Sequence, residues 1–444
     1  MNVNSIDRTR LYHVGNLSIF MIGLGFAVRA NIASDLQHDI YDKIDLANSA
    51  AMVGGALGAT FTGFALTLLF GSALVDLIGM KRMLLLSALG YILGSLGLLL
   101  AFFNPTSSSI EMIVLCSLLL TGLGWGAVEA ASNPMVASLY PEEKTHRLNI
   151  LHSWWPAGIV VGGLLGVGIS LAGLPWSINV LILMIPAIAL AWMVATSTFP
   201  VTERVAAGVS YKGMFGELIK RPLFWVFWAC MWLTAAAELA PGQWVDITLS
   251  NIVGMPGILI LVYVSGLMFV MRHFAGPIVE RISSVGLMFM SCLFAGIGLY
   301  LLSLANSPAL AFAAATVWGV GVCYMWPTTL AIVSERFPRG GAMAMGLMGF
   351  AGGMSIQFVL PQMGAIFDSA KAEAAGGVAK LATLSPDALE EVVRYASVES
   401  FQSVAIIPLI LLPVFGLIWF FDRKKGHQPE VIGEPGTPPD NQLN

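Results

Sequence analysis

The chain has 444 residues, of which 57% are hydrophobic and 11% charged, and its formal net charge is −4. Charged residues make up about 25% of an average soluble domain, and a soluble core stops growing at roughly 250–300 residues. So much apolar surface must face lipid, which excludes a soluble enzyme, a nucleic-acid-binding protein with a basic surface and a secreted disulfide scaffold.

Twelve apolar runs divide the chain. A helix crosses a hydrocarbon core of about 30 Å with roughly 20 apolar residues, and lipid cannot satisfy the backbone groups of an open strand. The sequence therefore predicts an all-α membrane protein with twelve transmembrane helices. Their expected ranges are 12–34, 48–77, 80–102, 108–138, 146–172, 174–198, 222–249, 254–280, 284–305, 308–334, 340–368 and 399–421.

Arg29, Asn31 and Asp35 lie at the end of the first run and just after it. A charged group at mid-membrane costs about 2.5–3.5 kcal/mol, so such groups are candidates for function. Asn31 and Asp35 are four residues apart and share a helix face; Asp35 is either a protonation site or the interfacial end of the helix. Arg29 either neutralises Glu129 across the bundle or binds an anionic substrate, and the sequence leaves both roles open.

A short pattern recurs at the ends of the second and eighth runs. A small residue is followed four positions later by an acid and then by a turn with bases, and the second copy begins 204 residues after the first. A helix-end acid beside a turn can accept bonds from the next helix start, which predicts a cytoplasmic gating motif in each half. Ordinary interfacial residues are the alternative, although two copies in register argue against it. The gating residues are Asp76, Gly79, Lys81 and Arg82 in the first copy and Glu280 and Arg281 in the second.

The fourth run places Glu129 and Asn133 on one helix face, just before Pro134. Burial among apolar helices favours the neutral form of a carboxyl group, so Glu129 is the main candidate for carrying a proton. The alternative is a glutamate that only fixes helix packing through a buried hydrogen bond. His152 in the fifth run extends the same polar string and is a further candidate for substrate binding.

The twelve runs, the central loop and the repeated motif resemble the major facilitator superfamily over about residues 10–425. Within it, Glu-x-Ala-x-Asn-Pro followed by His-x-Leu-Asn is similar to the fucose–galactose–glucose proton symporter (L-fucose permease-like) branch. The resemblance implies two pseudo-symmetric six-helix bundles and proton-coupled sugar binding. It implies that Glu129 couples to protons, that Asn133 contacts a sugar hydroxyl, and that Asn31 and Asp35 match a pair in the family's first helix. The Trp-Trp-Pro of the fifth helix departs from this branch, so the sugar itself is left open.

The longest cytoplasmic connection, residues 199–221, separates an N-terminal six-helix bundle at 1–198 from a C-terminal one at 222–425. The outer loop 369–398 alternates alanine with charges and is expected to form a short amphipathic helix. The proline-rich tail 426–444 is expected to be disordered.

Lysine and arginine gather in the loops of one side of the predicted bundle, the side that also holds both termini. The loops of the opposite side are acidic. Cytoplasmic loops carry the positive residues, so we expect a multi-pass protein of the plasma (inner) membrane with both termini in the cytoplasm. The basic residues of the opposite side are Lys43, Lys371, Lys380 and Arg394.

The seventh run contains Glu238, Pro241-Gly242, Gln243 and Trp244. The Pro-Gly pair predicts a helix broken beside a cavity. Gln243 offers a donor and an acceptor to hydroxyl groups, and Trp244 offers an apolar face to a sugar ring. A place in the outer aromatic belt is the alternative for Trp244. Glu238 is a second carboxyl candidate for proton coupling.

Trp326 in the tenth run and Gln357 in the eleventh complete the predicted substrate site, although helix–helix bonding accounts for a buried glutamine nearly as well. The sequence therefore predicts a secondary transporter that imports a small polar solute, in the first place a monosaccharide, by proton symport around a midplane site. An efflux antiporter of drugs or metabolites and an importer of an anionic sugar acid are the alternatives.

The sequence holds no nucleotide-binding loop, metalloprotease motif or nucleophile elbow. We therefore expect no enzyme activity, no cofactor and no metal site. The expected partners are the solute, protons and the lipid bilayer, with no nucleic acid, and the expected oligomeric state is a monomer.

Overall fold

The computed structural model describes residues 6–140, 144–201, 210–253, 255–337, 340–381 and 383–425. Helices make up almost all of this part of the chain, and no strand occurs within it. Eleven of the described helices are long and apolar enough to cross a membrane, and α12 adds a shorter apolar helix of 15 residues. The prediction of an all-α fold with twelve crossings is confirmed.

The first six crossings are α1, α4, α5, α6, α7 and α8, and three short elements connect α1 to α4. The bounds of this half are α1 Arg8–Asn31, α2 Ala33–Leu36, η1 Gln37–Tyr41, α3 Asp42–Ile44, α4 Ser49–Ile78, α5 Met80–Phe103, α6 Ile110–Leu139, α7 Lys144–Leu171 and α8 Ser177–Ala195.

The remaining helices form the second half, which is preceded by the short helix α10. Their bounds are α10 Tyr211–Ile219, α11 Pro222–Val253, α12 Ile258–Arg272, α13 Ala275–Ser303, α14 Pro308–Val322, α15 Met325–Arg336, α16 Gly341–Ala374, α17 Val378–Leu381 and α18 Pro386–Lys425.

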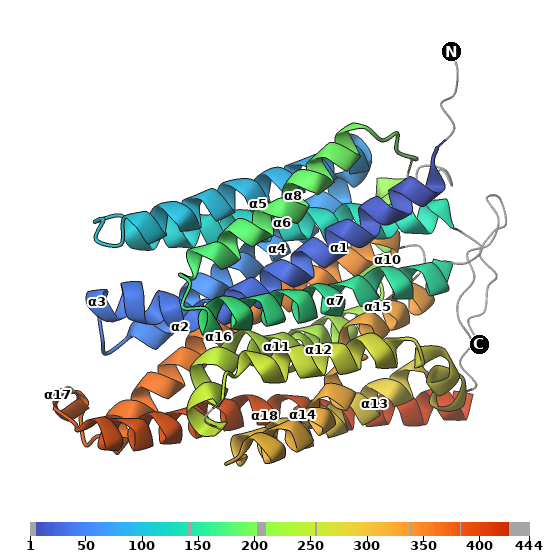
Figure 1. Cartoon of the computed structure of the whole chain (residues 1–444). Helices are drawn as coiled ribbons and strands as arrows, with labels where there is room; N and C mark the ends of the chain where they lie inside the picture. Colours follow the sequence, from blue (N-terminus) through green and yellow to red (C-terminus); the bar gives the residue numbers. More distant parts are fainter. Residues whose placement is uncertain are drawn as a thin grey trace.

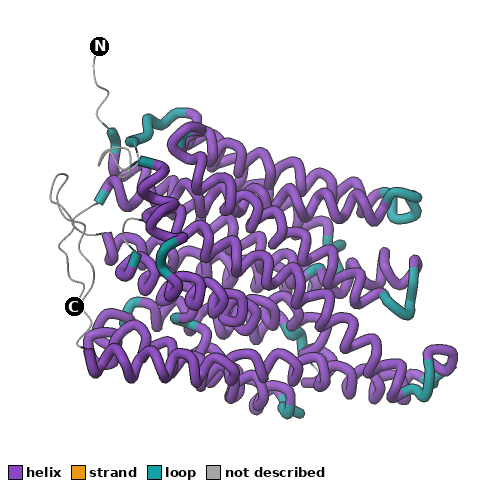
Figure 2. The backbone as a smooth tube through the Cα atoms, turned by 180° about the vertical axis from the view of Figure 1, so that it is seen from behind, coloured by secondary structure: helices purple, strands orange, loops and turns teal. Residues whose placement is uncertain are grey.

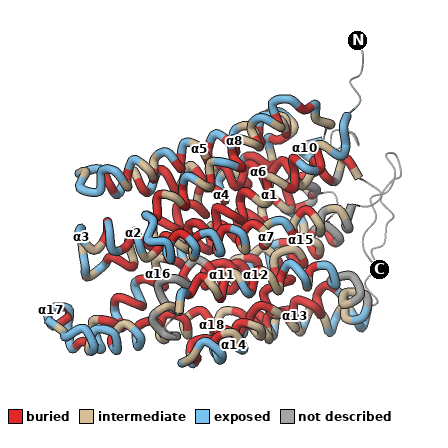
Figure 3. Tube along the Cα trace, viewed as in Figure 1, coloured by how far each residue is buried: buried red, intermediate tan, exposed pale blue. Residues whose placement is uncertain are grey.

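Figure 1 shows the blue-to-green helices of the first half on one side of the bundle and most of the yellow-to-red helices on the other. Helix α1 begins, and α18 ends, at the same end of the bundle. Seen from behind in Figure 2, most of the loops lie toward the two ends of the bundle. Buried residues gather where helices face one another (Figure 3), whereas Ile185 and Trp192 of α8 are each 66% exposed. Such apolar exposure is expected of a surface that contacts lipid.

The two halves meet where α4 packs on α16, α7 on α12 and α1 on α11. Glycines allow the first pair to come close at both ends. A Cβ on Gly364 would lie 2.6 Å from the carbonyl oxygen of Ala50, and a Cβ on Gly346 would lie 2.5 Å from Oγ of Ser72. The interface is therefore closed along the α4–α16 side in this conformation.

The predicted break of the seventh helix is wrong, because α11 runs through Pro241 and Gly242. The interruptions lie instead between α12 and α13, in the eighth crossing, and between α14 and α15, in the tenth. They bond to each other: the Tyr324 hydroxyl donates to the carbonyl of Met271 (2.8 Å), and Arg272 Nε donates to the carbonyl of Cys323 (3.2 Å). Backbone groups freed inside the membrane thus find protein partners, as lipid requires.

The internal repeat has a structural counterpart at two turns. Gly79 ends α4 with a φ of 87°, and Ser283, which lies 204 residues later, kinks α13 with a φ of 65°. Among the described residues, Ser283 is the one non-glycine residue with a positive φ. The eighth crossing therefore consists of α12 and the first turns of α13, and the ninth begins after Ser283.

The outer loop differs from its prediction. Instead of one short helix within 369–398, α16 extends to Ala374, the single turn α17 follows, and α18 already begins at Pro386. Part of the predicted linker (202–209) and the predicted tail (426–444) lie outside the described residues.

Candidate functional site

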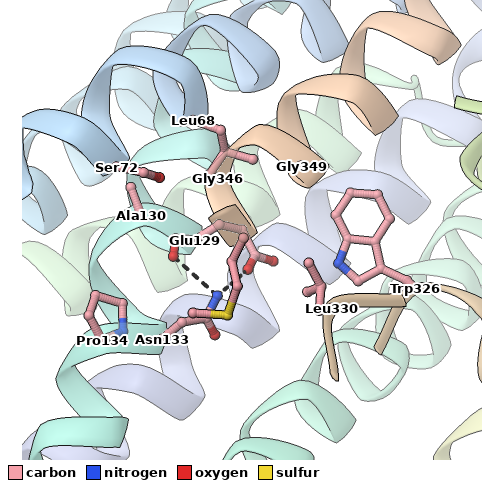
Figure 4. Close-up of a pocket in the computed structure, with 11 residues that line it drawn as sticks. Leu68, Ser72, Glu129, Ala130, Asn133, Pro134, Trp326, Leu330, Gly346 and Gly349 are labelled. Carbon is pink, nitrogen blue, oxygen red and sulfur yellow. Dashed lines mark hydrogen bonds between the residues drawn. The ribbon is translucent and has the colours of Figure 1, made fainter. Parts of the chain in front are cut away.

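Three predicted residues form one hydrogen-bonded chain across two helices. Asn133 Nδ2 donates to Glu129 Oε2 at 2.9 Å within α6, and His152 Nε2 of α7 bonds to Asn133 Oδ1 at 2.9 Å. The first bond follows from the spacing of four residues, which places both side chains on one helix face. Figure 4 shows the Glu129–Asn133 pair beside Pro134.

The chemistry of the three groups fixes the direction of this chain. An ionised carboxylate only accepts hydrogen bonds, so Asn133 must turn its NH2 group toward Glu129 and its carbonyl toward His152. An amide carbonyl also only accepts, so the Nε2 atom of His152 carries the proton in this arrangement. The chain therefore uses one carboxyl oxygen of Glu129 as an acceptor.

Glu129 and Asn133 line a cavity between the halves. Its volume is about 380 Å³ including space open to solvent, and its walls come from α4, α6, α15 and α16. Ser72 adds a hydroxyl group and Trp326 an indole ring, and Figure 4 shows them on opposite sides of Glu129. Leu330 and two glycines of α16 complete much of the apolar wall. This first cavity thus combines a carboxylate, an amide and an aromatic face contributed by both halves.

A second cavity, of about 270 Å³, lies between α1 and α7 of the first half and α11, α12 and α14 of the second. Glu238 and Ser265 face it. Both Glu238 Oε2 and Ser265 Oγ are buried and have no hydrogen-bond partner among the described residues. Arg272 Nη2 lies 3.7 Å from Glu238 Oε1. Sequence reasoning missed Arg272 here, although an arginine inside an apolar run is itself a signal.

A continuous group of rings, the aromatic bridge, connects the two cavities. Neighbouring ring centroids lie 4.5–6.5 Å apart. Trp326 lines the first cavity, and Phe26 and Trp155 line the second. The aromatic bridge consists of Phe26, Phe61, Phe64, Trp125, Trp155 and Trp326.

Arg29 is buried against the aromatic bridge rather than in either cavity. Its guanidinium carbon lies 5.4 Å from the ring centroid of Trp125 and 6.0 Å from that of Phe26, a separation at which a cation is attracted to the ring face. Arg29 belongs to the wall of neither cavity, which gives the anionic-substrate role no support from geometry.

Three other predicted residues lie apart from these cavities. Asn31 packs against α7: a Cβ added to Gly166 of α7 would lie 2.5 Å from Cγ of Asn31. Gln357 packs in the same way against Gly58 of α4. Asp35 lies in α2, beyond the end of α1. Partial burial, with the charge of Asp39 adding to it, raises the pKa of Asp35 to about 6, so this group titrates near neutral pH at the end of the bundle.

Trp244 is fully buried. Its alternative place in a lipid-facing aromatic belt is therefore wrong, and it is part of neither cavity wall. The side chain of Gln243 lies outside the described residues.

The gating residues of the first half surround the turn at Gly79. Asp76 is half-buried and Arg82 is exposed. Lys81 Nζ donates to the carbonyls of Ala195 (2.8 Å) and Ser197 (2.9 Å) at the end of α8. This lysine therefore ties the third crossing to the sixth. In the second half Arg281 is exposed, and the side chain of Glu280 lies outside the described residues.

Comparison with known proteins identifies the fold. No curated protein sequence matches the chain. The xylose transporter XylE from E. coli, solved in a partially occluded inward open conformation, has a TM-score of 0.71 at 13% identity over 92% of this chain and 97% of that chain. The nucleoside transporter NupG has a TM-score of 0.63 at 13% identity, covering 96% and 100%. The human organic anion transporter MFSD10 has a TM-score of 0.63 at 14% identity, covering 91% and 99%.

These identities are low enough that the likeness shows a shared fold and no shared substrate. The sequence model of the Major Facilitator Superfamily matches residues 15–361, most of the chain. Together with the transporters that share its architecture, this match shows that the chain belongs to the Major Facilitator Superfamily and is a membrane transporter rather than an enzyme.

Proposed function

We propose that this transporter imports a small polar solute of the monosaccharide class by proton symport. The observation that carries the proposal is the hydrogen-bonded chain from Glu129 through Asn133 to His152 at the wall of the first cavity. This chain connects a carboxyl group that can take up a proton with polar atoms that can bind the hydroxyl groups of a solute. Trp326 offers the apolar face that the C–H side of a sugar ring needs.

The mechanism follows from the charge on Glu129. A proton from outside neutralises the carboxylate, which lowers the cost of closing the two halves around it. Once neutral, Glu129 can donate as well as accept, so Asn133 is no longer held in one orientation and its amide becomes available to the solute. Loss of the proton on the cytoplasmic side reverses these changes and releases the solute. The halves alternate around the site as in other secondary transporters.

We place the end of the bundle where α1 begins and α18 ends on the cytoplasmic side of the plasma (inner) membrane, because lysine and arginine gather in its loops. The gating motif around Asp76 and Gly79 lies at this end in our proposal.

The central experiment replaces Glu129 by glutamine, which keeps the shape and removes the titratable proton. A thermal-shift screen of purified protein against neutral sugars and sugar acids at two pH values first identifies a bound solute. In proteoliposomes with an inward proton gradient, Glu129→Gln should abolish accumulation above the outside concentration while solute exchange persists.

Glu111→Gln, the same change at an exposed position of α6, serves as the matched control and should accumulate solute normally. Uphill uptake by Glu129→Gln at the unaltered rate refutes the assignment. The same vesicles test direction, because extrusion driven by the inward gradient indicates an antiporter instead. Competition by sugar acids but not by neutral sugars indicates an anionic substrate.

A further inference from the structure

Arg272 is the last residue of α12 and lies at the interruption between α12 and α13. Its side chain is buried and makes contacts in three directions. Nε donates to the carbonyl of Cys323 at the facing interruption (3.2 Å), and Nη2 lies 3.7 Å from Glu238 Oε1. The third contact crosses to the other half of the molecule, where Nη1 donates to the backbone carbonyl of His152 in α7 (3.2 Å).

A second contact reinforces this crossing. The guanidinium carbon of Arg272 lies 5.9 Å from the ring centroid of Trp155, also in α7. His152 is the residue whose imidazole bonds to Asn133. A single polar path therefore runs from Glu129 in the first half to Glu238 in the second, and Arg272 is the link that spans the interface. An arginine side chain stays protonated in proteins, so it can carry an electrostatic effect along this path but no proton.

The charge on Glu238 determines the free-energy cost of keeping the Arg272 guanidinium buried in the closed interface. A buried guanidinium is tolerated when a carboxylate compensates it, whereas one left without its partner is strongly destabilising. Among the described residues, Arg272 and the Cys323 thiol are the charged or titratable groups that face Glu238, and the start of α15 at Trp326 adds a backbone N–H. When Glu238 takes up a proton, these surroundings offer Arg272 no second negative charge.

We propose that Arg272 is a positioning residue that latches the two halves through the carbonyl of His152 for as long as Glu238 is ionised. Protonation of Glu238 leaves the guanidinium uncompensated, and α7 and α12 separate so that water can reach it. This proposal rests on the proposed proton coupling and deepens it, because it gives the second carboxyl group a separate role. Glu129 couples the proton to the solute, and Glu238 couples a proton to the opening of the interface.

The test measures the conformation directly and needs no solute. Pairs of spin labels across the halves report their separation in lipid nanodiscs. Cysteines at exposed Phe103 and Leu310 report one end of the bundle, and cysteines at exposed Leu77 and Phe420 report the other. The exposed native Cys116 is first replaced by alanine. Distance distributions are recorded between pH 5 and pH 9 for the parent, Glu238→Gln, Arg272→Met and the double variant.

Glu238→Gln mimics the protonated state, so it should raise the ratio of open to closed molecules roughly tenfold or more at high pH. Arg272→Met in the same chain should lower that ratio again, because it removes the uncompensated charge. These opposite changes in the open-to-closed ratio distinguish the latch from a purely structural role. If Arg272 only supported folding, its replacement would change the ratio further in the same direction as Glu238→Gln. The pH dependence of the opening should also weaken in Arg272→Met.

A ratio in Glu238→Gln within twofold of the parent, or a double variant that is more open than Glu238→Gln, overturns the proposal. If Arg272→Met does not yield folded protein, Arg272→Lys replaces it. A lysine keeps the charge but cannot reach two carbonyls in the same planar geometry, so its pH response should survive with a smaller closed population. A latch that behaves as expected in a protein that shows no proton-driven uptake refutes the proposed function and leaves the conformational role of Arg272 standing.

Discussion

Asn133 lies between two partners of different character, a carboxylate on its own helix and an imidazole on the next. Its amide satisfies both at 2.9 Å, which holds α6 and α7 in a fixed relation around the first cavity. Ser72 and Trp326 meet the same space from α4 and α15. In the proposed mechanism, the Asn133 side chain therefore connects the proton-binding group, Glu129, with the cavity wall that contacts the solute.

Replacing Asn133 by aspartate tests this position with an isosteric change. Two carboxylates within hydrogen-bond distance cannot both ionise easily, so one of them holds a proton to higher pH. The pH profile of solute uptake should move in the alkaline direction by about one unit or more, measured as initial rates in proteoliposomes. The same substitution at exposed Asn104 should leave the profile in place. An unshifted profile in Asn133→Asp contradicts a coupling role for its neighbour Glu129.

The sequence predicts contacts of this kind only when they are local. Glu129 and Asn133 lie four residues apart on one helix, and helical periodicity alone places them together. The bond from His152 and the pairing of Glu238 with Arg272 each join two consecutive helices, and they depend on how those helices pack, which no local pattern encodes. Asn31 and Gln357 lie outside the walls of the two cavities described here: their polarity is visible in the sequence, but the glycine surfaces that they pack against are not.

At the scale of the helical element, the turns at Gly79 and Ser283 lie at equivalent positions of the two halves and have a similar backbone conformation with different residues. Both turns have a positive φ with an extended ψ, of 137° and 164° respectively, a region that is essentially reserved for glycine and costs other residues about 1–3 kcal/mol. Ser283 also accepts a hydrogen bond from the backbone N–H of Gly286 at 3.3 Å, which caps the ninth crossing.

Two opposite substitutions should therefore have opposite effects. Gly79→Ala should lower the free energy of unfolding by about 1–2 kcal/mol, although a Cβ there meets no atom within 4 Å. Ser283→Gly should raise it by about 1 kcal/mol, because replacing a capping serine by glycine costs only a few tenths. Thermal unfolding of the purified protein measures both. Gly55→Ala, at an open helical position, should be neutral or slightly stabilising; equal losses at Gly79 and Gly55 would contradict the backbone argument.

Helix interruptions were the least predictable elements. A proline inside a membrane helix is tolerated when neighbours satisfy the freed carbonyl, which is why Pro241–Gly242 leaves α11 continuous. The interruptions at His273–Phe274 and Cys323–Tyr324 each lie four residues before a proline, Pro277 and Pro327, and a proline cannot bond to the carbonyl four residues earlier. Bonds from Tyr324 and Arg272 between the two interrupted crossings stabilise the freed backbone. Pro241 carries the same local signal and leaves its helix continuous, so the sequence alone does not tell which proline interrupts a crossing.

Across the whole molecule, the end of the interface opposite the start of α1 is held by a side chain of one half that caps a helix of the other. Asp368 of α16 accepts the backbone N–H of Ala51 at 3.1 Å in the first turn of α4, a helix whose own N-cap residue makes no side-chain bond. Lys371 Nζ lies 3.1 Å from the other carboxylate oxygen, and both side chains are buried. Separation of the halves at this end has to break the cap.

Asp368→Asn keeps an oxygen for Ala51 but leaves the buried Lys371 ammonium without its partner. The free energy of unfolding should fall by about 3 kcal/mol, seen as a lower thermal midpoint in lipid or detergent. The double variant Asp368→Asn/Lys371→Met should recover most of the loss, because no buried charge remains. A single variant as stable as the parent would show that the pair adds nothing to the closed state.

The aromatic bridge also bears on proton leak in the proposed symport. Six rings stand between the space at Glu129 and the space at Glu238, and a phenyl face offers hydronium neither a ligand nor a hopping step. In the proposed proton symport, packed rings would block a continuous file of water molecules through this layer and so limit proton leak between transport cycles. If the proposed proton symport holds, small side chains in place of Phe64 and Trp125 should let protons leak through the protein in the absence of solute.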